Sequence, residues 1–208
     1  MPDLSHETAA LKSGTHRIAG IDEVGRGPLA GPVLAAAVVL DPVNIPPGLR
    51  DSKKLSRHRR EVLFDAICAS ADWAVAQADV GEIDRINILN ASLLAMRRAL
   101  DGLARAADHA LIDGNRLPDD LPCPATALIG GDDRCLSIAA ASIVAKVSRD
   151  RIMAGLAVDF PGYGWERNAG YATREHLTAL KSLGATPHHR VSFRPVHNIL
   201  YSSKQISL

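Results

Sequence analysis

The chain has 208 residues, of which 47% are hydrophobic and 23% charged, and its formal net charge is +1. This length suffices for one well-formed core, and the composition is ordinary for a globular protein. No apolar run is long enough to span a bilayer, no hydrophobic signal segment opens the sequence, and the three cysteines form no Cys-x-x-Cys pair. These features argue against a membrane span, a disulfide framework and a structural zinc site, so we expect a cytoplasmic protein with no membrane partner.

The first third of the sequence predicts strands separated by loops. Residues 1–15 are polar and are expected to form a flexible tail. Apolar runs predict strands over 16–22 and 31–40, joined by a glycine-rich loop, and a third strand over 73–80. Ser56 is a candidate N-cap for a helix that extends to about Ser70.

The remainder predicts strands that alternate with helices. The clearest helix covers 87–106, where leucines and a methionine recur at spacings of 4, 3, 4 and 3. Strands are expected over 109–113 and 125–129, and a helix over 134–157 is apolar on almost every side, which predicts a buried position. A last helix is expected between an N-cap at Thr173 and a glycine stop at Gly184.

This order of elements predicts an α/β fold. The early strands follow one another through short loops and should be antiparallel, whereas the later strands alternate with helices and should be parallel. We therefore expect a mixed sheet of about five strands, flanked by helices.

Acidic residues stand at the ends of three predicted strands. Asp22 and Glu23 end the first strand, Asp113 ends the fourth and precedes Gly-Asn, and Asp132 follows two glycines after the fifth. Each has a simpler interpretation: Asp113 as a turn residue, and Asp132 or its neighbour Asp133 as a helix cap. Together they would supply four oxygen ligands and no thiol, a set that suits Mg²⁺ or Mn²⁺.

Such a carboxylate cluster can hold two cations on either side of a scissile phosphate. One cation would generate the attacking hydroxide and the other would stabilise the leaving oxygen, so no serine or histidine nucleophile is required. Next to the first two carboxylates, Gly25-Arg26-Gly27 allows a backbone to approach a ligand closely, with a guanidinium beside it. The combination indicates a site that cleaves phosphodiesters.

Six segments of the chain match one known family. They are 20–33, 51–55, 112–115, 140–150, 170–173 and 189–196, and they occur in the family's order across nearly the whole sequence. On these segments the chain resembles bacterial type 2 ribonuclease H, ribonuclease HII. The resemblance implies an RNase H-like catalytic core over 16–160 and a C-terminal helical, substrate-binding extension over 161–208.

The resemblance also implies an activity. The protein should hydrolyse the RNA strand of RNA–DNA hybrids and cut duplex DNA on the 5′ side of a single embedded ribonucleotide, leaving 3′-hydroxyl and 5′-phosphate ends. Its cofactor should be Mn²⁺ or Mg²⁺, with two cations in the substrate complex. We expect it to act as a monomer on these duplexes.

Matching the family's motifs residue by residue gives a candidate site. The metal-binding and catalytic carboxylates would be Asp22, Glu23, Asp113 and Asp132. Gly25, Arg26 and Gly27 would recognise the 2′-hydroxyl, the group that distinguishes RNA from DNA, and Tyr171 would lie against the sugar at the junction. Ser52 and Lys53 are candidate phosphate contacts that position the duplex without reading its sequence.

Several positions leave alternatives open. Lys146 lies on a polar line with Ser142, Arg149 and Asp150, which is either a solvated stripe with a local ion pair or a phosphate contact. The basic residues between Arg50 and Arg60 form either a solvated face or a phosphate-binding patch. Gly130 departs from the family, which often has lysine there.

Other function classes compete with a nuclease. A dinucleotide-binding protein would need a helix after the glycines, where this sequence predicts a strand. A hybrid-binding module without activity is a second alternative, and a nuclease or phosphatase with another substrate is a third. Metal binding and dependence on a 2′-hydroxyl distinguish these classes.

Overall fold

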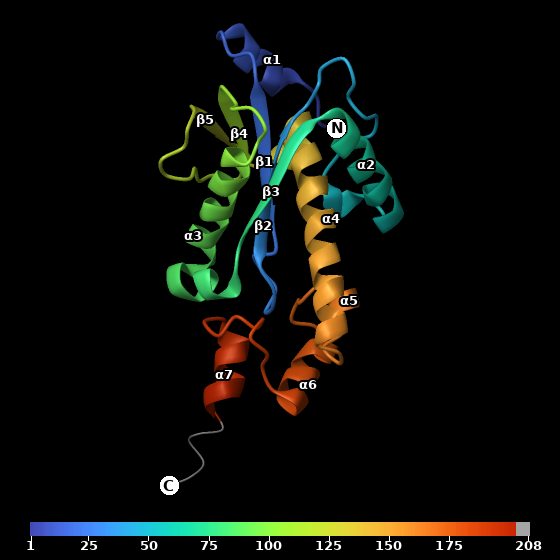
Figure 1. The fold of residues 1–208 in the computed structure, drawn as a ribbon, viewed down its shortest axis with the longest axis vertical. Coiled ribbons are helices and arrows are strands. Elements are labelled where there is room, and N and C mark those ends of the chain that lie inside the picture. Colours follow the sequence, from blue (N-terminus) through green and yellow to red (C-terminus); the bar gives the residue numbers. More distant parts are fainter. Residues whose placement is uncertain (203–208) are drawn as a thin grey trace.

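The computed structural model describes residues 1–202, and a five-stranded mixed sheet forms its centre (Figure 1). The spatial order is β3-β2-β1-β4-β5. β1 pairs antiparallel with β2 and β2 with β3, whereas β1 pairs parallel with β4 and β4 with β5, which confirms the predicted topology. The strands are β1 (Ile18–Val24), β2 (Val33–Val39), β3 (Asp72–Ala78), β4 (His109–Asp113) and β5 (Ala125–Leu128).

Helices cover both faces of this sheet (Figure 1). One face carries α3 (Val80–Asp101), and the other carries α4 (Leu136–Asp159) and α2 (Arg57–Ser70). Successive residues of a strand face opposite sides, so Ala37 of β2 packs with Met96 of α3, while Val38 packs in the cluster of Ile143 of α4. The sheet therefore lies between two hydrophobic layers.

Local signals placed several helix ends correctly. The side chain of Ser56 accepts from the backbone N–H of Arg59 and caps α2, and Thr173 caps the helix that follows it. The helix expected over 87–106 instead begins at Val80, after a capping box between Asp79 and Glu82, and is kinked at Asn87, whose φ is 66°. The hydrophobic stripe starts only after this kink, so periodicity alone missed the first two turns.

The sequence predicted a flexible tail over 1–15, but much of this segment is helical and packs against the rest of the protein. Residues Ser5–Lys12 form α1, and the Glu7 carboxylate on this helix is buried. Glu7 accepts a hydrogen bond of 2.8 Å from the backbone N–H of Ser137 and one of 3.1 Å from Sγ of Cys135. Because α4 has no side-chain cap of its own, Glu7 satisfies part of its first turn from outside. The partner lies 130 residues away, so no local pattern could predict the contact.

Three helices complete the C-terminal part: α5 (Trp165–Asn168), α6 (Arg174–Leu183) and α7 (Arg194–Ser202). Only α6 was predicted. Their core contains Trp165, Leu180 and Val196 together with Met153 of α4 and Leu29 of the glycine loop. The expected extension over 161–208 therefore shares its packing with the loop between β1 and β2, while positions 203–208 lie outside the described residues.

Across residues 1–202, none of the helices has the length and hydrophobicity needed to cross a bilayer.

Candidate active site

Three carboxylates from three different elements meet at one edge of the sheet. Asp22 comes from β1, Asp113 from the end of the parallel neighbour β4, and Asp132 from η2 (Gly131–Asp133), a short 3₁₀ turn before α4. One oxygen from each lies within 4.8 Å of the others. Asp113 is held in place by a hydrogen bond of 2.7 Å from the backbone N–H of Gly131 to its Oδ1.

Glu23 lies beside this cluster rather than within it. The sequence placed the end of the first strand at Asp22, but β1 continues to Val24. Neighbouring residues of a strand point to opposite faces, so Asp22 and Glu23 diverge. Glu23 accepts a hydrogen bond of 3.2 Å from Nη1 of Arg26 and lines a pocket of about 250 Å³ that also includes Asp113.

Burial and mutual repulsion destabilise the negative charges of the cluster, so a bound cation would be favourable there. Burial, reinforced by the charges of Glu23 and Asp113, raises the pKa of Asp22 well above its ordinary value. Burial also raises the pKa of Asp132, although Lys53 opposes the change. The donors are all carboxylate oxygens, which fit a hard divalent cation such as Mg²⁺ or Mn²⁺.

Lys53 is the positive side chain that approaches the cluster. It lies on η1 (Ser52–Lys54), and its Nζ is 3.1 Å from Oδ2 of Asp132 and 3.7 Å from Oδ1 of Asp51. Partial burial opposes the charge, but these carboxylates raise the pKa of Lys53. Its side chain remains largely exposed, so it can also reach a ligand.

The structure distinguishes between the two adjacent aspartates of η2. Asp132 is buried in the cluster, whereas Asp133 is exposed and forms an ion pair with Lys54. Gly130, where the family often has lysine, adopts a left-handed conformation with a φ of 64° and open space around it. The departure therefore leaves the carboxylate arrangement intact.

The other candidate phosphate contacts differ in exposure. Ser52 is buried, and its Oγ lies 2.9 Å from Oγ of Ser142 on α4. Lys146 is partly exposed and forms an ion pair of 2.7 Å with Asp150. The polar line on α4 is not a solvated stripe throughout, because Ser142 and Arg149 are buried.

The glycine loop and Tyr171 meet although they are far apart in sequence. A Cβ at Gly27 would lie 3.3 Å from the Tyr171 ring, and the N–H of Leu29 donates a hydrogen bond of 2.7 Å to the Gly170 carbonyl. The Tyr171 side chain is 46% exposed. The loop leads into strand β2 rather than a helix, so the dinucleotide-binding alternative fails.

Sequence reasoning missed two buried polar groups behind this loop. Arg149 and Arg190 are fully buried, and burial lowers the pKa of Arg149 to about 10 and that of Arg190 to about 9. His176 and His189 form a second buried group, with their Nε2 atoms 3.1 Å apart. Arginine and histidine are usually surface residues, so only their neighbours in space reveal these roles.

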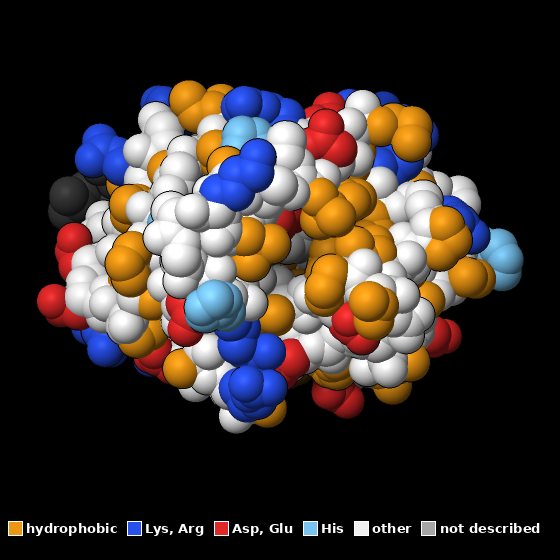
Figure 2. Space-filling view, turned by 90° about the horizontal axis from the view of Figure 1, so that it is seen from above, with side chains coloured by type: hydrophobic (Ala, Val, Ile, Leu, Met, Phe, Trp, Pro, Cys, Tyr) orange, Lys and Arg blue, Asp and Glu red, His pale blue; other side chains and the backbone are white. Residues whose placement is uncertain are grey.

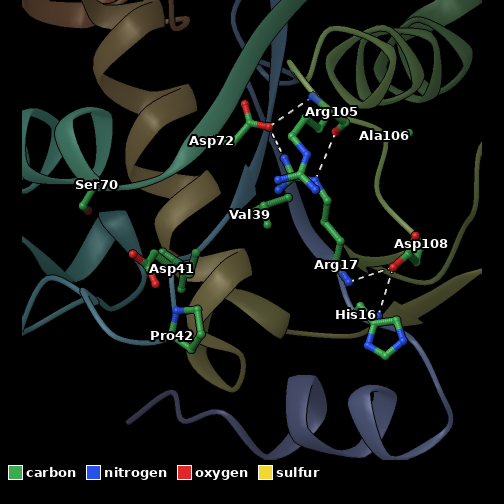
Figure 3. Close-up of a pocket in the computed structure, with 11 residues that line it drawn as sticks. His16, Arg17, Val39, Asp41, Pro42, Ser70, Asp72, Arg105, Ala106 and Asp108 are labelled. Carbon is green, nitrogen blue, oxygen red and sulfur yellow. Dashed lines mark hydrogen bonds and ion pairs between the residues drawn. The ribbon is translucent and has the colours of Figure 1, made fainter.

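A second polar pocket, of about 430 Å³, lies where β1 and β4 begin, at the opposite end of these strands from the carboxylates (Figure 3). There Arg17 pairs with Asp72, and Oδ2 of Asp108 accepts hydrogen bonds from the backbone N–H groups of His16 and Arg17 at 3.0 and 2.9 Å. These groups satisfy one another and tie the starts of the strands together.

Seen from the α1 end of the molecule, hydrophobic side chains gather around a central hollow (Figure 2).

Comparison with known proteins gives a consistent result along the chain. The family model described as Ribonuclease HII matches residues 19–196. Ribonuclease HII of Paracoccus denitrificans (strain Pd 1222) is 62% identical over 199 residues, which cover 96% of this chain and 95% of that protein. Ribonuclease HII of Cereibacter sphaeroides (strain ATCC 17025 / ATH 2.4.3) is 62% identical over 206 residues, with 99% and 97% covered. Among solved structures, ribonuclease H2 from Pyrococcus horikoshii OT3 superposes with a TM-score of 0.76 at 26% identity, covering 91% of this chain and all of the other.

Proposed function

The chain belongs to the ribonuclease HII family, and on that premise we propose which substrates it cuts, where, and with which residues. Family membership makes it a metal-dependent endoribonuclease that hydrolyses the RNA of RNA–DNA hybrids. The proposed activity also includes duplex DNA that contains a single ribonucleotide, with the cut on its 5′ side. The products would carry 3′-hydroxyl and 5′-phosphate ends.

The convergence of Asp22, Asp113 and Asp132 within 4.8 Å is the observation that supports this proposal most strongly. These carboxylates, with Glu23 at the edge, would hold two divalent cations, Mn²⁺ or Mg²⁺. When bound, such cations activate water and stabilise the leaving oxygen of the phosphodiester. The chain itself contributes the fixed carboxylates and, in Lys53, a positive charge beside Asp132.

The glycine loop and Tyr171 would select the ribonucleotide. Arg26 pairs with Glu23 and Gly27 lies against the exposed Tyr171 ring, so a sugar held against the tyrosine would contact the loop backbone. A 2′-hydroxyl both donates and accepts hydrogen bonds, and backbone groups can provide both partners. This arrangement favours a substrate with ribose at the scissile position.

Charged side chains around the cluster would hold the flanking phosphates. Lys53 and Lys146 offer ammonium groups. Ser52, which is buried and held by its hydrogen bond with Ser142, would support a phosphate contact at the same place. Such contacts position a duplex without reading its sequence. The C-terminal extension, which carries Tyr171, would complete the binding surface, and we expect one copy of the chain to suffice.

The test is cleavage of an end-labelled DNA duplex that carries one ribonucleotide, with Mg²⁺, with Mn²⁺ and with a chelator. The matching all-DNA duplex is the control. The proposal predicts a metal-dependent cut on the 5′ side of the ribonucleotide and none in the all-DNA duplex. Cleavage of both duplexes would refute ribose selection, and no cleavage by the folded protein with either metal would favour a module that binds hybrids without cutting them.

A further inference from the structure

Two buried guanidinium groups lie behind the glycine loop without an acidic partner. Arg149 and Arg190 are fully buried, and within residues 1–202 neither forms a salt bridge with a carboxylate, since their side chains donate to backbone carbonyls. Removing a charged group from water is costly unless hydrogen bonds replace its hydration. The hydrogen-bond partners of the two arginines therefore indicate their role.

Within the described part of the chain, every hydrogen bond of the Arg190 side chain goes to a backbone carbonyl of the loop between β1 and β2. Its Nη2 lies 2.6 Å from the Gly25 oxygen, its Nη1 3.0 Å from the Arg26 oxygen, and its Nε and Nη2 lie 2.9 and 2.8 Å from the Gly31 oxygen. Its own backbone N–H donates a hydrogen bond of 2.8 Å to Leu29. One side chain thus holds both ends of the loop.

These contacts determine where the loop's donors point. The peptide bonds are trans, so the N–H of each peptide points away from its carbonyl oxygen. The carbonyls of Gly25 and Arg26 face Arg190, and therefore the N–H groups of Arg26 and Gly27 face the opposite side. Neither N–H donates to another group within residues 1–202. A Cβ at Gly27 would lie 3.3 Å from the Tyr171 ring, so a sugar held against the tyrosine would lie close to these N–H groups.

We propose that Arg190 is a positioning residue for ribose recognition, which it achieves by orienting the N–H groups of Arg26 and Gly27 toward the 2′-hydroxyl. The inference rests on the proposed function, since it assumes that the loop reads this group. The guanidinium also polarises the Gly25 and Arg26 peptides, whose carbonyls it binds, because hydrogen bonds in a chain strengthen one another. A charge buried behind the loop thus makes its outward donors stronger.

Arg149 provides a matched control. It is equally buried, and among residues 1–202 it also donates only to carbonyls, at 2.9 Å to Pro32, 2.9 Å to Ala169 and 3.0 Å to Ala30. None of these carbonyls belongs to the peptides that carry the N–H groups of Arg26 and Gly27, which Arg190 holds through Gly25 and Arg26. Arg149→Lys and Arg190→Lys should therefore destabilise the fold to a similar extent, but only the second should disturb the outward donors.

The experiment compares two constants for wild type and both variants, with melting temperatures measured in parallel. The first is KM for the duplex with one ribonucleotide, and the second is Ki of the all-DNA duplex as a competitive inhibitor. We expect Arg190→Lys to raise KM about tenfold with Ki unchanged, as for loss of one good hydrogen bond, while Arg149→Lys keeps the wild-type ratio of Ki to KM. The same ratio of Ki to KM in wild type and both variants would overturn the inference. A wild-type ratio near one would instead refute ribose selection itself.

A measurement on the wild type covers the case in which Arg190→Lys does not fold. The amide signals of Arg26 and Gly27 in ¹⁵N–¹H spectra should shift when the ribonucleotide duplex is added with a chelator present. The all-DNA duplex should leave these two signals nearly unchanged. Equal shifts with both duplexes would contradict the proposed role of these donors.

Discussion

Lys53 donates a hydrogen bond of 3.1 Å from Nζ to Oδ2 of Asp132, although 79 residues separate them along the chain. The contact gives the carboxylate cluster one positive neighbour from the protein itself. A divalent cation at the cluster would share Asp132 with this ammonium, and a phosphate nearby would be attracted to it. Lys53 should therefore weaken the binding of a divalent cation and strengthen the binding of the substrate.

Lys53→Gln tests this opposition. Removing the positive charge should strengthen divalent cation binding, on the order of threefold to tenfold, because one repulsive charge near the cluster is lost. The same change should weaken binding of the hybrid and lower its salt dependence by about 0.9 in log–log slope, as for one lost phosphate contact. Calorimetric metal titration and hybrid binding at several salt concentrations measure both effects. Lys54→Gln, whose partner Asp133 lies outside the cluster, should change neither by much.

Asp113→Asn should nearly abolish turnover while leaving the fold intact. Asparagine preserves the shape and the oxygen that accepts from Gly131, but it removes the charge that would bind the cation. We expect kcat to fall on the order of 100-fold or more. Mn²⁺ should raise the melting temperature of the wild type, because it binds to the folded state, and it should raise the melting temperature of the variant much less. Asp119→Asn, at an exposed position, is the control; wild-type turnover in Asp113→Asn would refute its assignment as a ligand.

The buried histidines predict a loss of stability in mild acid. Burial, followed by the influence of His176, lowers the pKa of His189 to about 4 from an ordinary value of 6.5. The folded state thus keeps His189 neutral where the unfolded chain already binds a proton. Its contribution to stability is complete above pH 6.5 and is lost as the pH falls toward 4, by at most about 1.4 kcal/mol for each pH unit.

Unfolding by urea at pH 7.5, 6 and 5 measures this loss. His189→Gln should have a shallower dependence of the free energy of unfolding on pH than the wild type, because its side chain does not titrate. His58→Gln, at an exposed position, should keep the wild-type dependence. Identical slopes in all three proteins would show that His189 does not contribute.

The buried hydrogen bond between Glu7 and Ser137 indicates that the N-terminal helix stabilises the protein. Glu7→Ala removes the acceptor for the N–H of Ser137 at the start of α4 and should lower the free energy of unfolding by about 1–2 kcal/mol. Glu7→Gln keeps an accepting oxygen and should cost less. Thr8→Ala, an exposed change on the same helix, should have little effect. Chemical denaturation of the three variants compares them, and equal stability of Glu7→Ala and Thr8→Ala would argue against a capping role.

Much of the fold was predictable because its signals are local. Alternation and apolar runs located the five strands, the caps Ser56 and Thr173 located two helix starts, and loop lengths indicated which strands are parallel. The acidic residues at strand ends were recognisable by their type and position. These features depend on residues within a few positions of one another, which a sequence displays directly.

The tertiary structure decided what depends on distant neighbours. It separated Glu23 from Asp22 by continuing β1, chose Asp132 over Asp133 for the cluster, and fixed Glu7 against α4. It also buried Arg190 behind the glycine loop, 165 residues from Gly25 in sequence. Burial and hydrogen-bond partners are set by contacts between segments far apart in the chain, so residue type and spacing alone could not reveal them.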